Sequence, residues 1–178
     1  MAYQAYNKMQ KKKMNCDMKK EIDQAYARLK KHTDITISSR EFYDWVMKKG
    51  YSLYQRDLNR AKDKSEFTDT YTYTHYRKEI CKAIQDAPNA GEDYYTGEKL
   101  NWNLIGQYNN SDAKQGGKDY KREFALMPTV DHINAEAKPE FVICSWRMND
   151  AKNDLSECEF TKLCISFLRQ KGFEISKK

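Results

Sequence analysis

The sequence predicts an α+β protein, with a mainly helical N-terminal part, a two-stranded hairpin followed by a helix, and a packing helix at the C-terminal end. Apolar residues recur at helical spacing through much of residues 17–86, and two short runs of β-formers lie at 129–133 and 141–146. With 178 residues, 39% of them hydrophobic and 33% charged, the chain can bury a core as one domain or as two small ones.

The first predicted helix begins at Asp17, a suitable N-cap, and carries Met18, Ile22 and Leu29 on one face. The basic run Lys11–Lys13 precedes it. We interpret residues 1–16, which contain this run, as a solvated, frayed terminus, with a phosphate-binding arm as the alternative.

The next stretch predicts two short helices joined by a tight turn. Capping boxes begin at Ser38 and at Ser52, and Gly50 is expected to end the first helix. An ordinary helical hairpin is the simpler interpretation. The alternative is a helix-turn-helix-like unit whose second helix offers Arg56, Asn59 and Arg60 for base or phosphate contacts.

Alternating Thr and Tyr residues at 67–76 predict an exposed strand or a loop before a helix that runs to Asp86. The segment 87–91, which contains Pro and Gly, then breaks the helical pattern. This break separates residues 1–90, a basic helical region that could bind DNA, from residues 91–178. The two regions could still form one continuous compact domain.

The positive charge is concentrated in the first of these regions. Residues 1–90 hold 19 Lys and Arg against 12 Asp and Glu, a balance of +7, whereas residues 91–178 hold 13 against 14, a balance of −1. A basic half beside a nearly neutral half suits a phosphate-rich partner.

The residues that can carry chemistry gather in the stretch 128–154. Asp131 and His132 lie at the end of the first predicted strand, and Asn149 opens the helix that follows the second strand. A hairpin followed by a helix brings these positions together, so the three side chains are expected to converge. Because neighbouring strand residues point to opposite faces, the Asp-His pair must lie where the strand ends or bends.

This stretch resembles the HNH, or ββα-metal, endonuclease family. The resemblance rests on V-D-H-I at 130–133, a hydrophobic second strand that ends in I-C-S-W at 143–146, and N-D-A-K-N-D at 149–154. The sequence departs from the family at Glu140, where members usually carry Asn, and it lacks the CxxC pairs that bind zinc in many members.

The resemblance implies a ββα-metal nuclease core that hydrolyses phosphodiester bonds in DNA with one divalent metal ion. Asp131 and Asn149 would bind this ion, most naturally Mg²⁺ with Mn²⁺ as an alternative, because both side chains offer hard oxygen ligands. His132 would be the general base, since imidazole titrates near neutral pH. Lys152 and Asn153, on the same helix, are the candidates for contacts to the substrate phosphate.

Two segments upstream complete this region. Residues 94–99 predict a turn similar to the Thr-Gly turn of the family, with Tyr94 and Tyr95 near the places of its zinc cysteines. Packing of these aromatic rings is expected to brace the turn in place of a metal. Residues 109–118 predict a polar, mobile loop.

The C-terminal helix is predicted from a capping box at Ser156 and a helix-ending Gly172. Its apolar stripe comprises Phe160, Leu163, Cys164, Phe167 and Leu168. These positions follow the spacing i, i+3, i+4, i+7 and i+8, which predicts a core helix that buries one face against the hairpin.

The cysteine spacing and the absence of long apolar runs bear on cofactors and on location. The five cysteines, at positions 16, 81, 144, 158 and 164, show no CxxC spacing, so we expect no structural zinc. The start lacks the apolar segment of a signal peptide, and no apolar run approaches membrane-spanning length. We therefore expect a soluble, cytoplasmic protein without a membrane partner.

The expected partner is double-stranded DNA, and a homodimer could supply the two sites that a cut through both strands can require. Two other functions stay open. One is a nucleic-acid-binding protein that keeps the scaffold without turnover, which the departure at Glu140 favours. The other is a ribonuclease or toxin.

Overall fold

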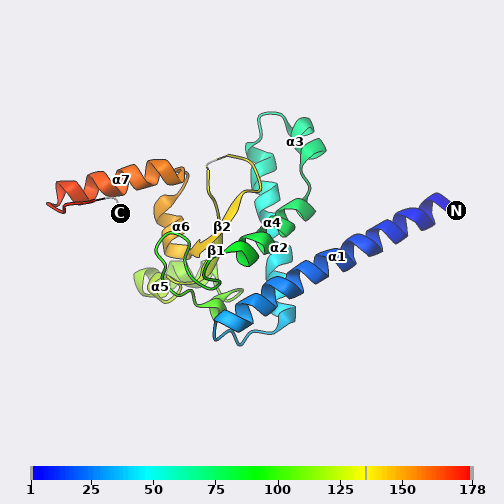
Figure 1. Ribbon diagram of the computed structural model, residues 1–178, viewed down its shortest axis with the longest axis horizontal. Helices are drawn as coiled ribbons and strands as arrows, with labels where there is room; N and C mark the ends of the chain where they lie inside the picture. Colours follow the sequence, from blue (N-terminus) through cyan, green and yellow to red (C-terminus); the bar gives the residue numbers. More distant parts are fainter. Residues whose placement is uncertain (1, 135, 177–178) are drawn as a thin grey trace.

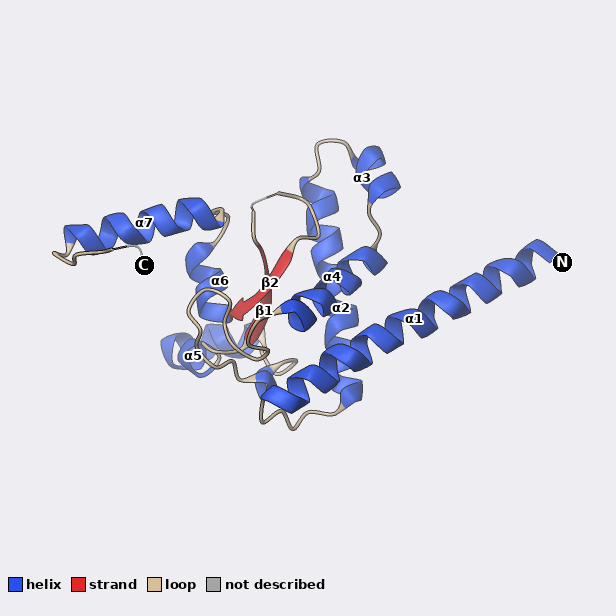
Figure 2. Ribbon diagram, in the orientation of Figure 1, coloured by secondary structure: helices blue, strands red, loops and turns tan. Residues whose placement is uncertain are grey.

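The computed structural model describes residues 2–134 and 136–176, with side chains from Asp17 onward except that of Asn110. Within these residues it contains seven α-helices, one 3₁₀ helix and one two-stranded antiparallel sheet, which confirms a mostly helical α+β fold (Figure 2). The elements are α1 (Ala2–His32), α2 (Ser39–Arg60), α3 (Lys64–Thr70), α4 (Tyr73–Asp86), η1 (Trp102–Leu104), α5 (Asn110–Glu123), β1 (Pro128–His132), β2 (Phe141–Ser145), α6 (Trp146–Lys152) and α7 (Glu157–Gln170).

Helix α1 is longer than the sequence predicted, because it begins at Ala2 and not at Asp17. Residues 2–16 contain neither Pro nor Gly, so nothing in that segment stops a helix from extending. The side chains of Lys11–Lys13 and Cys16 lie outside the described ones. Further along, Ile22 and Leu29 are buried as predicted.

Helix α2 is one continuous helix, so the predicted helical hairpin with a break at Gly50 is wrong. The capping box at Ser38 is confirmed. Instead of ending a helix, Gly50 lies against Arg77 of α4. A Cβ at position 50 would lie 2.5 Å from the Cγ of Arg77 and 3.2 Å from its backbone nitrogen. Glycine therefore allows α2 and α4 to approach closely.

Two segments predicted to be non-helical are helical. Residues 67–70 end α3 and residues 73–76 start α4, and between them Thr72 caps α4 in a capping box with His75. Residues 109–118 belong mostly to α5, which is kinked at Gly117 (φ 56°, ψ −130°). In both cases local capping outweighs the polar composition that suggested a loop.

The hydrophobic core runs across the position predicted as a domain boundary. The buried cluster includes Ile22 and Ile80 from the helical part and Val130 and Ile143 from the hairpin. Helix α4 packs against β2, with the ring of Tyr76 centred 5.5 Å from that of Phe141. The helical part and the hairpin therefore share one core.

The hairpin followed by a helix is confirmed. Strands β1 and β2 pair antiparallel, with Asp131 opposite Val142 and His132 opposite Phe141. Helix α6 starts at Trp146, three residues before the predicted start, because the hydroxyl of Ser145 caps it directly after β2.

A buried carboxylate braces the turn before β1. The side chain of Asp93 accepts hydrogen bonds from the backbone N–H groups of Tyr95 (2.8 Å), Thr96 (3.0 Å) and Ser145 (2.6 Å). The rings of Tyr94 and Tyr95 do pack edge to face, with centroids 5.0 Å apart. The link from the turn to the end of β2, however, comes from Asp93, which the sequence analysis did not single out.

Helix α7 corrects a further expectation, because it does not bury a face against the hairpin. None of its residues is buried. It extends away from the rest of the molecule, on the side opposite to the projecting N-terminal end of α1 (Figure 1). In the described part of the chain, no helix combines the length and the hydropathy that a bilayer crossing needs.

The Asp93 brace leads to a prediction about stability. Asp93→Ala removes three charge-assisted hydrogen bonds and leaves the Ser145 N–H without its acceptor, so we expect a loss of about 3 kcal/mol in the free energy of unfolding. Denaturant titration followed by circular dichroism measures it. The matched control is Asp119→Ala, which removes an exposed carboxylate and should change the unfolding midpoint little. Equal midpoints for the two variants would contradict the brace.

Candidate active site

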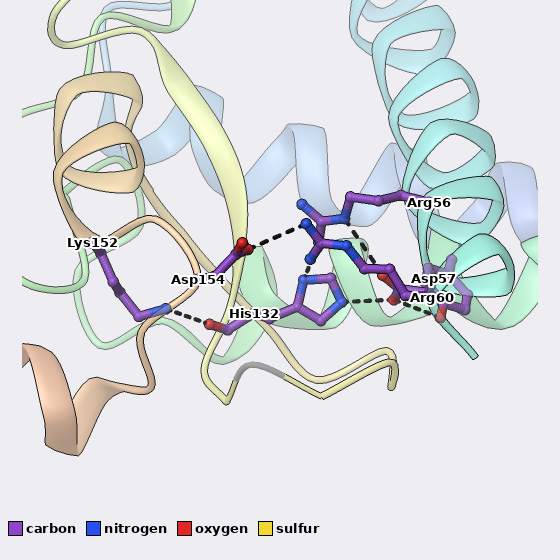
Figure 3. Close-up of polar contacts among 7 residues, drawn as sticks. Arg56, Asp57, Arg60, His132, Lys152 and Asp154 are labelled. Carbon is purple, nitrogen blue, oxygen red and sulfur yellow. Dashed lines mark hydrogen bonds and ion pairs between the residues drawn. The ribbon is translucent and has the colours of Figure 1, made fainter. Parts of the chain in front are cut away.

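The ring of His132, the last residue of β1, is held between the hairpin and α2. Its Nε2 lies 2.7 Å from Oδ2 of Asp57, and its Nδ1 contacts the guanidinium of Arg56 (Figure 3). The ring of Phe141 packs edge-on against it, with centroids 4.8 Å apart. His132 is 6% exposed, so these contacts fix the ring in one orientation.

The partners of the two ring nitrogens define the tautomer of His132. A guanidinium can only donate hydrogen bonds, so Nδ1 must accept one and carries the lone pair. Nε2 then carries the proton and donates to the carboxylate of Asp57. A base oriented by a buried carboxylate is an arrangement that suits proton transfer.

Asp57 is itself fixed from a second side. It is 1% exposed, and its Oδ2 also accepts a hydrogen bond of 2.7 Å from the hydroxyl of Tyr76. Burial and the hydrogen bond to Asp57 raise the pKa of Tyr76 far above its usual value, so the phenol remains a donor. Asp57 therefore joins α2, α4 and β1 at one buried point.

Asp131 faces a different set of partners from His132, as expected for neighbours on a strand. Its Oδ2 accepts a hydrogen bond of 2.8 Å from the hydroxyl of Tyr95 and lies 3.0 Å from Nζ of Lys152. Burial, followed by the charge of Asp131, raises the pKa of Tyr95, so this hydroxyl also stays protonated. Among the described residues, no hydrogen bond reaches the other oxygen, Oδ1.

Lys152 is buried, whereas a contact with substrate phosphate requires an accessible side chain. The sequence suggested a contact with substrate phosphate, but the side chain is 1% exposed. Its ammonium lies 3.0 Å from the carboxylate of Asp131 and donates to the backbone carbonyl of His132 at 3.0 Å. Because α6 directs Lys152 inward, the residue ties the helix to the end of β1.

All the site residues predicted from the sequence line one cavity of about 330 Å³. They are Asp131, His132, Asn149, Lys152 and Asn153. Asn153 ends α6 with a φ of 52°, a conformation that Asn tolerates better than most residues, and its N–H donates to the carbonyl of Asn149 at 2.9 Å.

Helix α2 supplies the positive side of this cavity. Arg56 and Arg60 both line it, and their side chains are 40% and 53% exposed. Arg60 pairs with Asp154 at 3.2 Å, a contact at the surface that is easily exchanged (Figure 3). Two accessible guanidinium groups therefore stand beside His132.

Sequence reasoning named Arg56 and Arg60 as possible contacts to nucleic acid but missed Asp57. A signal was present, because Asp57 follows Leu53 by one helical turn and so falls on the buried face of α2. A carboxylate on an otherwise apolar stripe needs a buried partner, and His132 is that partner.

Glu140, where the sequence departs from the HNH pattern, makes none of the contacts that hold the His132 ring. Its side chain is exposed, and its backbone carbonyl accepts a hydrogen bond of 3.2 Å from the N–H of Ile133. The orientation of His132 therefore depends on Asp57 and Phe141 and not on the side chain at position 140.

A scan against protein-family models, a search of curated proteins and a search of solved structures each found no significant match to this chain.

The tautomer of His132 is directly measurable. In ¹⁵N-labelled protein near neutral pH, long-range ¹H–¹⁵N correlation should show a protonated Nε2 and an unprotonated Nδ1, because Asp57 accepts and Arg56 donates. In Asp57→Ala this preference should weaken or disappear. The exposed His32 serves as an internal reference in both proteins. A proton on Nδ1 in the unaltered protein would contradict the proposed geometry.

Proposed function

We propose that this chain is an HNH-type endonuclease that hydrolyses phosphodiester bonds in DNA, with His132 as the general base. The observation that carries the proposal is the buried Asp57–His132 pair beside a cavity that Asp131 and Asn149 also line. Support also comes from the resemblance of residues 128–154 to the HNH motif and from the hairpin–helix unit on which these residues lie.

The proton transfer follows from the contacts of the ring. Nδ1 bears the lone pair, and in the free protein Arg56 donates to it. A phosphate binds a guanidinium through stronger, charge-assisted and often bidentate hydrogen bonds, so a bound substrate draws Arg56 away. Nδ1 can then take the proton of the attacking water, while Asp57 stabilises the imidazolium that forms.

The residues present fit a divalent cation. Asp131 keeps Oδ1 available within the described structure, and Asn149 lines the same cavity, so two hard oxygen ligands border one space. When bound, the cation stabilises the charge that develops on the phosphate and on the leaving oxygen. Lys152 holds Asp131 in place through their ion pair and lowers the net negative charge of the site.

The nature of the substrate is proposed from charge. Residues 1–90 carry a balance of +7, and Arg56 and Arg60 bring part of that charge to the cavity. A surface of this kind attracts the phosphate backbone of nucleic acid, with an affinity that falls as salt rises. Double-stranded DNA is the proposed partner, and the same contacts would serve RNA if the enzyme were a ribonuclease.

A second candidate function is a nucleic-acid-binding protein without turnover. The ion pair between Lys152 and Asp131 favours it, because a buried ammonium already neutralises the carboxylate that would bind the metal. Metal binding separates the two candidates. Titration of Mn²⁺ followed by electron paramagnetic resonance should show binding that Asp131→Ala abolishes if the site is catalytic.

The nuclease proposal is tested with purified protein, supercoiled plasmid and Mg²⁺ or Mn²⁺. We expect nicking or linearisation that falls by about 10³-fold in His132→Ala, because the general base is lost. His32→Ala, at an exposed histidine that does not line the cavity, is the matched control and should cleave normally. Parallel reactions on RNA and single-stranded DNA define the substrate. No cleavage of any substrate with either metal, together with salt-dependent DNA binding, would favour the binding protein instead.

Asp57 is expected to act as a positioning residue for His132. In Asp57→Asn, kcat should fall about 100-fold with little change in KM, because the ring loses its charged acceptor while the side chain at position 57 keeps its size. Asp57→Glu should recover part of the rate. The control is Asp44→Asn, which neutralises a partly exposed carboxylate on the same helix. A rise in KM without a fall in kcat would contradict this role.

A further inference from the structure

Helix α7 presents a large apolar face to solvent. Leu163 is 55% exposed, Phe167 59%, and Phe173, just beyond the helix, 61%. Contiguous apolar surface of this kind marks a contact with another macromolecule. The helix stands clear of the core in Figure 1, and Leu163 and Phe167 each keep more than half of their surface exposed.

The position of α7 is fixed at its first residues. The N–H of Glu157 donates to the carbonyl of Ile133 at 3.2 Å, and the hydroxyl of Tyr94 donates to the carboxylate of Glu157 at 3.4 Å. A capping box of Ser156 and Glu159 closes the N-terminus of the helix. The helix therefore starts from the hairpin in a defined direction and carries its apolar face outward.

A helix of this length needs a partner. It has 14 residues, and isolated helices of about 12–15 residues are marginal in water. Both ends are well formed, since Gly172 adopts a φ of 82° and the N–H of Phe173 donates to the carbonyl of Leu168 at 3.1 Å. What the helix lacks among the described residues is a surface to pack against.

We propose that α7 pairs antiparallel with α7 of a second copy of this chain. Four residues of the apolar stripe, Phe160, Leu163, Cys164 and Phe167, are symmetric about the point between Leu163 and Cys164, which is also the middle of the helix, whereas the position matching Leu168 is Glu159. A two-fold axis through that point places Phe160 of one copy opposite Phe167 of the other. It also places the two Leu163 side chains, and the two Cys164 side chains, beside one another. One patch thus complements itself, as a two-fold interface requires.

The charges at the edge of the stripe favour the antiparallel arrangement. Glu157 lies in the first turn, and Lys171 caps the last. The ammonium of Lys171 lies 5.8 Å from the centre of the Phe167 ring, so it stands on the apolar side of the helix. Antiparallel pairing brings Lys171 of each copy to Glu157 of the other, whereas parallel pairing would bring like charges together.

The contact between two α7 helices is small. A helix of 14 residues is about 21 Å long, so two such helices bury less surface than a standard protein interface. The dimer is therefore expected to be concentration-dependent and to dissociate on dilution. Its formation does not depend on nuclease activity.

Sedimentation of the full chain over a concentration series tests the proposal. The weight-average mass should rise from one chain toward two as concentration increases from low micromolar to several hundred micromolar. Leu163→Asp and Phe167→Asp should each keep the chain monomeric, and their circular dichroism should match the parent because both side chains are exposed. Ser166→Asp adds the same charge at an exposed site away from the stripe and should still dimerise.

Cross-linking with a short bis-maleimide tests the position of the axis, in a background with Cys16→Ser. A chain that keeps Cys164 but carries Cys158→Ser should be linked into dimers. One that keeps Cys158 but carries Cys164→Ser should not, because the two Cys158 residues lie on the outer side and about 16 Å apart along the pair. A monomer at every concentration, a dimer insensitive to Leu163→Asp, or links mainly through Cys158 would each overturn the proposal.

Discussion

The hydrogen bond between the buried carboxylate of Asp57 and the ring of His132 holds the site together. It joins a helix of the N-terminal part to the last residue of the first strand, over a distance of 2.7 Å. A buried charge without partners would cost free energy of folding, and Asp57 also accepts a hydrogen bond from the hydroxyl of Tyr76. Together with the contacts of Arg56 and Phe141, this hydrogen bond between distant parts of the chain fixes the orientation of the ring.

The two buried carboxylates of the site, those of Asp57 and Asp131, have similar kinds of hydrogen-bond partner. Asp57 meets a tyrosine hydroxyl and the His132 ring, while Asp131 meets a tyrosine hydroxyl and the ammonium of Lys152. Each buried carboxylate thus has a tyrosine hydroxyl as a neutral donor and a cationic partner as well, since Nε of Arg56 lies 3.4 Å from Oδ1 of Asp57. Such networks are costly when one member is removed, which gives the site a rigid set of donors and acceptors.

Much of the hairpin–helix unit could be predicted from sequence, because its signals are local. The alternation ending at His132 and the helix formers around Asn149 define strand and helix within a few residues. What could not be predicted depends on distant packing. In the sequence, Gly50 has the pattern of a helix stop, but in the structure it lies against Arg77 inside a continuous helix. The sequence likewise suggests an accessible Lys152, whereas its ammonium is paired with Asp131. The stripe of α7 has the pattern of a core helix, and only the structure shows that none of its residues is buried.

The shared core has a consequence for how this protein could be divided or combined with others. In many modular proteins a hairpin–helix unit can be moved between chains as a self-contained cassette. Here the unit lacks its own acceptor for the histidine ring, and Phe141 packs on Tyr76 from the preceding helix. A fragment that starts after residue 90 would keep the motif and lose the groups that orient it.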